Sequence, residues 1–80
     1  MHYIYFLRSL KNPDKTYVGY TTNLKERLKK HNAGGSIYTV DYRPWKIVTY
    51  ICFDDESKAL EFEKYIKAGS GYAFAQKRFW

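Results

Sequence analysis

Three polar side chains occupy positions at which two predicted helices should face the rest of the molecule. Across residues 23–32, leucines four apart mark the apolar side at about 100° per residue, and Arg27 and His31 fall on that side. Across residues 56–67, Glu63 lies within the arc of apolar positions. An inward charge needs a partner or a task, because burying it alone is costly. These side chains are therefore the first candidates for a functional site.

Two interpretations of this arrangement stay open. Glu63 either forms a structural ion pair with Arg27 at the boundary of helix and sheet, or binds a divalent metal. One carboxylate without a neighbouring Asp, His or Cys ligand suits Mg²⁺, which keeps several water ligands and takes others from a substrate phosphate. The sequence has neither a hydrolase order of Ser, His and Asp nor a glycine-rich phosphate loop after a strand, which excludes nucleotide-dependent transfer.

Short elements must position these side chains. Aromatic and β-branched residues predict three strands, over residues 2–8, 16–21 and 46–53. Capping residues and apolar periodicity predict helices over 23–32 and 56–67, with a last short helix or tail over 72–80. This order favours an α+β fold with a small three-stranded, largely antiparallel sheet flanked by helices.

Glycines interrupt the pattern at two places. Gly19 lies inside the second predicted strand, where a glycine marks either a close approach by a ligand or another backbone, or a β-bulge. The run Gly69-Ser70-Gly71 is predicted to separate the helix over 56–67 from the C-terminal element.

Composition limits the classes to which the chain can belong. Its 80 residues predict one domain over 1–80 and exclude a two-lobed cofactor cleft. The hydrophobic share of 45% is too high for a disordered chain, and no apolar run approaches the length of a membrane span. The start lacks a secretory signal, so we expect a cytoplasmic protein. A lone Cys52 in an apolar run excludes an internal disulfide and predicts a buried, unreactive thiol.

The charge balance favours a polyanionic partner. The chain has 14 Lys and Arg against 8 Asp and Glu, a net charge of +6, and five of the acids fall within residues 51–63. A basic protein with a confined acidic segment is typical of nucleic-acid binding, although solubility alone explains the same net charge.

Two tripeptides on the first two predicted strands resemble the paired motifs of the GIY-YIG nuclease superfamily, namely Tyr3-Ile4-Tyr5 and Tyr17-Val18-Gly19. The first has a tyrosine where the motif is named for glycine, and the second has valine for isoleucine. Further similar segments follow in the order of the family: Arg27-x-x-x-His31-Asn32, Tyr42-Arg43-Pro44-Trp45, a glutamate on the next helix, and Lys67-Ala68-Gly69-Ser70-Gly71. The last of these resembles the small single-domain members, and the likeness covers the whole chain.

One departure concerns the C-terminal part of the expected site. Many members carry an asparagine there, whereas residues 68–80 contain none. Ser70 and Gln76 are the candidates to replace that side chain.

The resemblance implies a divalent-metal-dependent endonuclease that hydrolyses phosphodiester bonds in DNA. Its implied catalytic residues are Tyr5, Tyr17, Arg27, His31 and Glu63. Arg27 would stabilise the charge that develops on the phosphate, and His31 would assist proton transfer or position a tyrosine. Glu63 would hold Mg²⁺ or Mn²⁺ while water attacks in line and the 3′ oxygen leaves. A phenol with a pKa near 10 needs a nearby cation or hydrogen-bond donor to act as a base at neutral pH. Which of the two tyrosines is the base stays open.

Basic residues outside this pocket would bind the nucleic-acid backbone, and the candidates are Lys15, Lys25, Lys29, Lys30, Arg43, Lys46, Lys77 and Arg78. Simple solvation of an outer helix face is the alternative explanation for the lysines within 23–32. Because no zinc finger or helix-turn-helix is appended, we expect little sequence specificity. The substrate would then be chosen by its DNA structure, in repair or recombination, or by a protein partner. RNA stays open as a substrate.

Two other functions stay open at this level. One is a nucleic-acid-binding module that keeps the nuclease fold and cleaves little without a partner. The other is a subunit whose exposed aromatic residues, Trp45, Phe79 and Trp80, dock a partner protein. An inward Glu63 favours the nuclease over the first alternative, because a carboxylate that repels phosphate has no use in a module that only binds.

Overall fold

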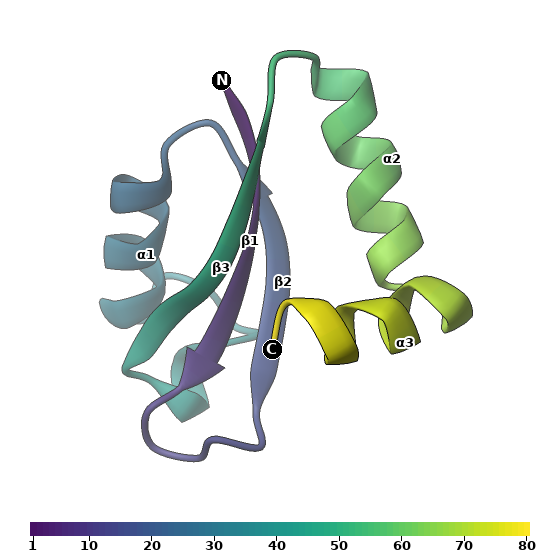
Figure 1. Cartoon of the computed structure of the whole chain (residues 1–80). Coiled ribbons are helices and arrows are strands. Elements are labelled where there is room, and N and C mark those ends of the chain that lie inside the picture. Colours follow the sequence, from purple (N-terminus) through teal and green to yellow (C-terminus); the bar gives the residue numbers. More distant parts are fainter.

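Three strands form one antiparallel sheet in the order β2-β1-β3 (Figure 1). The strands are β1 (His2–Ser9), β2 (Thr16–Thr21) and β3 (Trp45–Phe53). The computed structural model describes every residue from 1 to 80. The expected three-stranded antiparallel sheet is confirmed, and β1, at its centre, pairs with both other strands.

Helices cover both faces of the sheet. They are α1 (Leu24–Asn32), α2 (Glu56–Ile66) and α3 (Gly69–Arg78), and a short 3-10 helix, η1 (Val40–Tyr42), precedes β3. Figure 1 shows α1 on one side of the sheet and α2 with α3 on the other. Asn23 caps α1 by accepting from the backbone N–H of Glu26, and Asp55 caps α2 by accepting from that of Ser57. The predicted α+β class is confirmed.

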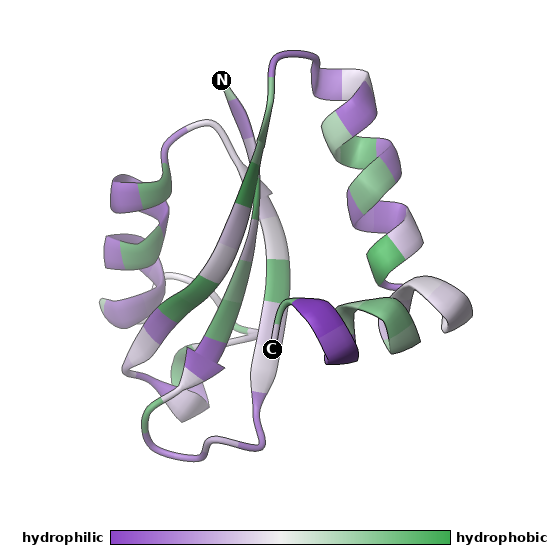
Figure 2. Cartoon of the chain, viewed as in Figure 1, coloured by the Kyte–Doolittle hydropathy of each residue, from purple (hydrophilic) through white to green (hydrophobic).

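The central strand supplies a core to each face, because successive side chains of a strand point to opposite sides. Ile4 and Phe6 pack with Ala59, Ile66 and Ala75 on the α2–α3 side. On the α1 side, the equivalent cluster consists of Tyr5, Leu7 and Trp45. Figure 2 shows the hydrophobic residues concentrated on the strands and hydrophilic ones prominent on α1. One face therefore has an apolar core, and the other a core that includes a tyrosine hydroxyl.

The expected boundary between the last two helices is wrong. Residues 69–71 were predicted to be a break, yet α3 begins at Gly69. A Cβ at Gly71 would overlap the carbonyl oxygen of Tyr65, so this glycine permits a close contact of α3 with the end of α2. Here a glycine required by packing had the appearance of a helix breaker.

Two expectations about burial are also wrong. Cys52 is exposed near the end of the edge strand β3. Trp45 is buried, and its indole N–H donates to the carbonyl of Thr39. Phe79 and Trp80 pack on Phe6 with ring centroids 5.1 and 5.3 Å away. These aromatic residues mainly stabilise the fold, which removes the basis for the predicted docking subunit.

Candidate active site

A chain of buried polar groups connects β1 to the segment after α1. The hydroxyl of Tyr5 lies 2.9 Å from Nε2 of His31, and Nδ1 of His31 lies 2.7 Å from Oγ1 of Thr39. Tyr5 and His31 are each 2% exposed, and Thr39 is 0% exposed. The last turn of α1 thus places the imidazole between two hydroxyl groups that determine its orientation. Because both hydrogen bonds are internal, substrate cannot reach His31 without displacing one of them.

Gly19 makes room for this arrangement. It lies opposite Tyr5 in the register of β1 and β2. A Cβ at this position would overlap the Tyr5 hydroxyl and would lie 3.0 Å from Cε2 of Tyr17. The group that approaches this glycine is thus the Tyr5 side chain, and not the ligand or second backbone that the sequence suggested. The irregularity in the strand pairing instead lies between Phe6 and Leu7, where β1 meets β3.

The second motif tyrosine is more accessible. Tyr17 is half-buried on the edge strand β2, with its ring centroid 6.3 Å from that of Tyr5 and 5.3 Å from that of His31. The ammonium of Lys67 lies 5.8 Å from the Tyr17 ring centroid. Tyr17 also lines an open cavity together with Lys67. It is therefore the motif tyrosine that an incoming substrate can contact directly.

Glu63 forms an ion pair, but not with the expected partner. Its Oε2 accepts from Nζ of Lys67 at 3.1 Å, one helical turn further along α2. The proposed structural pair of Glu63 with Arg27 is therefore wrong. The Glu63 side chain is 21% exposed and that of Lys67 is 50% exposed, so the pair is screened by water and adds little stability.

Arg27 lies one turn before His31 and has no acidic partner within ion-pair distance. It is half-buried and lines a polar hollow of about 260 Å³ with Thr21, Asn23, Glu26 and Lys30. An arginine held at the rim of a polar hollow without a carboxylate partner is free to bind an anion.

The electrostatics around Tyr5 connect the two sides of the sheet. Burial is the main reason that the pKa of Tyr5 lies well above its usual value, and Tyr17 and Glu63 raise it further while Arg27 lowers it. Arg27 and Glu63 thus act on one hydroxyl from different helices. Burial, followed by the charges of Arg27 and Lys30, lowers the pKa of His31, so this imidazole is neutral at pH 7.

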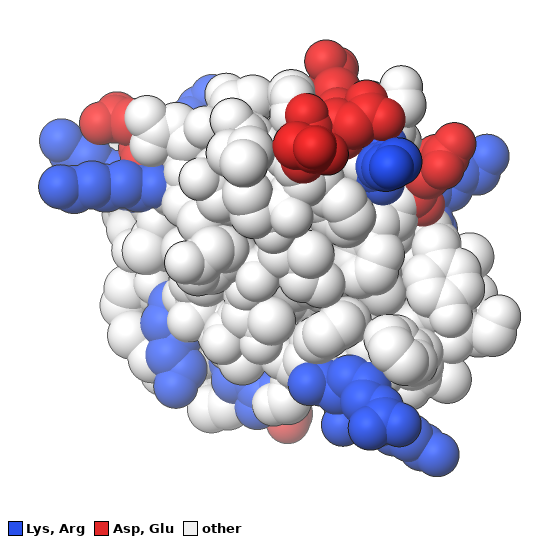
Figure 3. Space-filling model, turned by 45° about the horizontal axis from the view of Figure 1, so that its top comes forward, with Lys and Arg blue, Asp and Glu red and all other residues white.

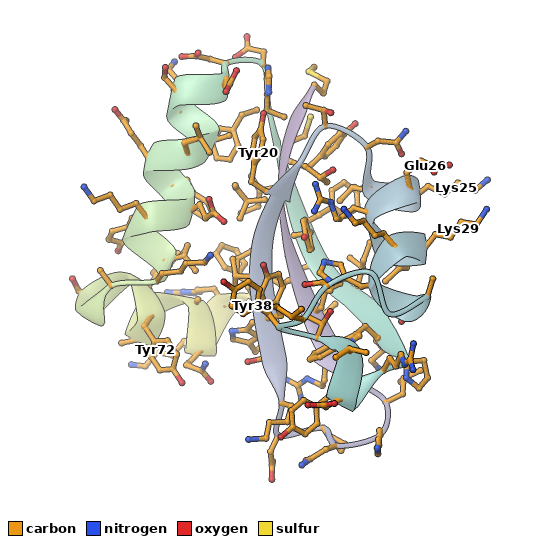
Figure 4. The ribbon with its side chains drawn as sticks, turned by 180° about the vertical axis from the view of Figure 1, so that it is seen from behind. Tyr20, Lys25, Glu26, Lys29, Tyr38 and Tyr72 are labelled. Carbon is orange, nitrogen blue, oxygen red and sulfur yellow. The ribbon has the colours of Figure 1, made fainter.

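The basic residues proposed to bind nucleic acid lie in three groups at the surface. Lys25, Lys29 and Lys30 lie on α1, where Figure 4 shows Lys25 and Lys29 directed away from the sheet. Lys15, Arg43 and Lys46 lie around the loops at one end of the sheet, and Lys77 and Arg78 end α3. Figure 3 shows the largest group of acidic side chains where α2 begins, away from the basic groups at the opposite edge.

Sequence reasoning missed two residues of the site. Lys67 could have been found, because it follows Glu63 by four residues on one helix and so shares its face. Thr39 had no such signal, since it lies in a segment without regular periodicity and reaches His31 only through the fold. Of the candidates to replace the asparagine, Ser70 lies on the other side of α3, in a hollow with Phe74 and Lys77.

The residues around Tyr17 fit a divalent metal only in a limited way. No group of three His, Cys, Asp or Glu side chains could enclose an ion, and Glu63 is the carboxylate whose charge acts on Tyr5. Mg²⁺ accepts such a site when waters and a substrate phosphate complete its shell. The donor set therefore fits a metal that binds together with a phosphate-containing substrate.

Residues 1–73 match the family described as "GIY-YIG catalytic domain". The chain belongs to the GIY-YIG family. This membership places it in a family of nucleases, whose substrates are nucleic acids. The resemblance inferred from the two tyrosine motifs is therefore confirmed.

Similar proteins occur in archaea and bacteria. A UPF0213 protein of Haloquadratum walsbyi is 40% identical over 68 residues, which cover 84% of this chain and 74% of the relative. A UPF0213 protein of Staphylococcus haemolyticus is 40% identical over 70 residues, covering 86% and 83%. The solution NMR structure of a UPF0213 protein from Bacillus halodurans covers 98% of this chain and 85% of its own, with 28% identity and a TM-score of 0.57. These names state no activity. The similarities support the assignment to the small GIY-YIG proteins and the fold. None of the helices has the length and apolar character that a membrane crossing requires.

Proposed function

We propose that this GIY-YIG protein is a divalent-metal-dependent endonuclease that hydrolyses phosphodiester bonds in DNA with little sequence specificity. The observation that carries the proposal is the convergence of both motif tyrosines with His31, under the charges of Arg27 and Glu63. The same proposal includes selection of DNA by its structure, a role in repair or recombination, a cytoplasmic location and a protein partner that adds specificity.

The two tyrosines take different roles in this proposal. Tyr17 lines an open cavity, so we assign it to direct contact with the substrate and the attacking water. Tyr5 has a buried hydroxyl and a raised pKa, which makes its phenolate costly to form. Its bond to a neutral His31 offers a route for the proton that the attacking water loses: as the Tyr5 oxygen accepts that proton, the Tyr5 hydroxyl passes its own to Nε2, and His31 becomes an imidazolium. The pair thus positions the site and moves a proton without leaving a phenolate buried.

Arg27 and Glu63 supply the charges. Arg27, which lacks an acidic partner, would bind a non-bridging phosphate oxygen and stabilise the charge of the transition state. Glu63 would hold Mg²⁺ or Mn²⁺ once Lys67 releases its carboxylate. When bound, the metal supplies a Lewis acid that stabilises the leaving 3′ oxygen. Positioning and electrostatics account for most of the rate in such reactions.

The variant Glu63→Gln tests this proposal. It keeps the volume of the side chain but removes the charge that a divalent metal requires, so cleavage should fall by at least about 10²-fold. The melting temperature should hardly change, because the pair with Lys67 is partly exposed. Glu61→Gln is the matched control, since Glu61 is exposed on the same helix and should leave cleavage unchanged.

Cleavage should be measured on branched, single-stranded and duplex DNA, and on RNA of the same sequence, with Mg²⁺ or Mn²⁺ against EDTA. Metal-free binding of DNA should hold or rise in Glu63→Gln, because one negative charge near the phosphate is removed. A folded Glu63→Gln protein that cuts at the parental rate would end the role of Glu63 as metal ligand. Binding without cleavage under every condition would favour the module that only binds.

A further inference from the structure

An open cavity of about 260 Å³ lies beside the candidate active site, between the edge strand β2, the end of α2 and α3. Three aromatic side chains line it, and they are Tyr17, Tyr72 and Trp80. Val18 and Ile66 contribute aliphatic surface. Tyr72 is 59% exposed although it belongs to this wall, and Figure 4 shows it on α3, on the opposite side of the sheet from α1. The Tyr72 ring is therefore accessible to a ligand that enters the cavity.

The cavity is continuous with the catalytic groups. Tyr17 and Lys67 belong to both, since Lys67 binds Glu63 at 3.1 Å and its ammonium lies 5.8 Å from the Tyr17 ring centroid. A planar ligand in the cavity would therefore have an ammonium group beside it and the carboxylate next to that. The aromatic wall suits a nucleobase, and the cation beside it suits the phosphate of the same nucleotide. The catalytic carboxylate then lies next to that phosphate.

We propose that this cavity holds one unpaired nucleobase next to the phosphodiester bond that is cleaved. The proposal rests on the proposed function and narrows its substrate class to strands with an unpaired nucleotide at the cut. A base inside a duplex is stacked on both sides and paired, so it cannot enter without being extruded. Aromatic side chains stack on any base, which agrees with low sequence specificity.

The size and charge of the cavity favour this occupant. Its volume lies below the ~300–1,000 Å³ typical of pockets for drug-sized ligands, so it suits a single ring system. The ammonium of Lys67 at the active-site side pairs with Glu63, and it would lose this partner when the carboxylate binds a metal. The adjoining phosphate of a nucleotide can then replace Glu63, which a purely apolar ligand cannot do.

The outer face of α3 extends the same pattern. Lys77 and Arg78 line a second hollow with the half-exposed rings of Tyr65 and Phe74, and the Arg78 guanidinium lies 5.9 Å from the Phe74 ring centroid. Single-stranded nucleic acid binds surfaces that combine basic groups with aromatic stacking platforms. The flanking backbone of a strand whose base occupies the cavity can therefore continue across α3.

Binding in EDTA, where no cleavage occurs, tests the cavity separately from catalysis. Fluorescence anisotropy would compare a short oligothymidylate with an abasic strand of equal length and with a duplex. Tyr72→Ala removes the exposed ring and should keep the fold, because alanine is the better helix former. Tyr72→Phe keeps the ring, and Tyr50→Ala removes a tyrosine that is 55% exposed on β3, at the opposite edge of the sheet.

We expect Tyr72→Ala to bind oligothymidylate about tenfold more weakly and the abasic strand unchanged, since stacking depends on the base. Tyr72→Phe and Tyr50→Ala should bind as the parental protein does. An equal loss on both strands, or no loss, would overturn the proposal. A parental protein that does not distinguish the two strands would overturn it as well.

A second measurement does not depend on any variant. A single 2-aminopurine in the strand should lose fluorescence on binding when it stacks in the cavity, and unchanged fluorescence at every position along the strand would overturn the proposal. Failure of the proposed function would appear differently, as absence of metal-dependent cleavage by the parental protein. Base-dependent binding in EDTA with no cleavage would thus support the cavity and reject the nuclease.

Discussion

The two faces of the sheet are built on opposite chemistry although they share β1. On the α2–α3 face, Ile4 and Phe6 are completely buried among apolar side chains. On the α1 face, the same strand places Tyr5 in a hydrogen-bonded chain with His31 and Thr39. The first face obtains its stability from apolar area removed from water, whereas the second combines buried Leu7 and Trp45 with polar groups that satisfy one another.

The difference between the two faces shows how a small chain can contain a polar site with little loss of folding stability. The α2–α3 face has a cluster of five buried apolar residues and the α1 face one that includes Leu7 and Trp45, so the α1 face can retain polar groups beside this apolar packing. The polar groups are then oriented by hydrogen bonds rather than by packing alone. Variants of the two faces should therefore fail in different ways.

The largest effect is expected on the apolar face. Phe6 is 0% exposed and contacts the rings of Phe79 and Trp80, so Phe6→Ala should lower the free energy of unfolding by about 3–5 kcal/mol. Cleavage should then be lost in proportion to the unfolded fraction. Urea unfolding measures the loss, and Phe74→Ala is the control because Phe74 is 42% exposed and should change stability little. Equal losses in both variants would refute the assignment of the core.

A smaller effect is expected where the faces meet. Gly19→Ala introduces a Cβ against the Tyr5 hydroxyl, so it should cost about 1–3 kcal/mol of stability through overpacking. Cleavage should fall even in the folded variant, because the ring of Tyr5 must move away from His31. Gly69→Ala is the matched control, since a Cβ there meets open space. Full cleavage by a folded Gly19→Ala protein would show that the position of Tyr5 does not matter.

The smallest effect is the pH dependence of the α1 face. Burial lowers the pKa of His31, so the unfolded chain binds a proton at a higher pH than the folded one. The free energy of unfolding should therefore decrease as pH falls below about 6.5, the value for an unperturbed histidine. His31→Gln should have a flatter profile between about pH 6.5 and 5, above the range in which carboxylates titrate. Parallel profiles for the two proteins would exclude a buried neutral imidazole.

Local periodicity predicted most of the fold. The second strand has the expected bounds, Thr16–Thr21, and the first and third differ by one residue at one end. Alternating aromatic and β-branched residues fit a pleated, half-buried surface, which is why they predicted these strands. The start of α3 was missed because the glycine at 71 acts through contact with Tyr65, which is a tertiary property.

Prediction of the candidate site was more uneven. The inward sides of Arg27, His31 and Glu63 followed from helical spacing, and in the structure they act on or contact Tyr5. The partner of Glu63 was chosen wrongly, since Lys67 lies closer along the same helix than Arg27 does across the sheet. The burial of Trp45 and the exposure of Cys52 could not be predicted, because both depend on how the elements pack over the sheet.

Strand and helix periods depend only on local backbone geometry, so the residues that share a face of each element can be recognised without the fold. The inward sides of Arg27, His31 and Glu63 followed from these periods, whereas the place of the two tyrosines came from the resemblance to the family. Only the tertiary structure decided that the Tyr5 hydroxyl meets His31, that Thr39 orients the imidazole, and that a cavity opens between β2 and α3. These features join segments distant in the chain, and such contacts form only when the apolar faces pack together.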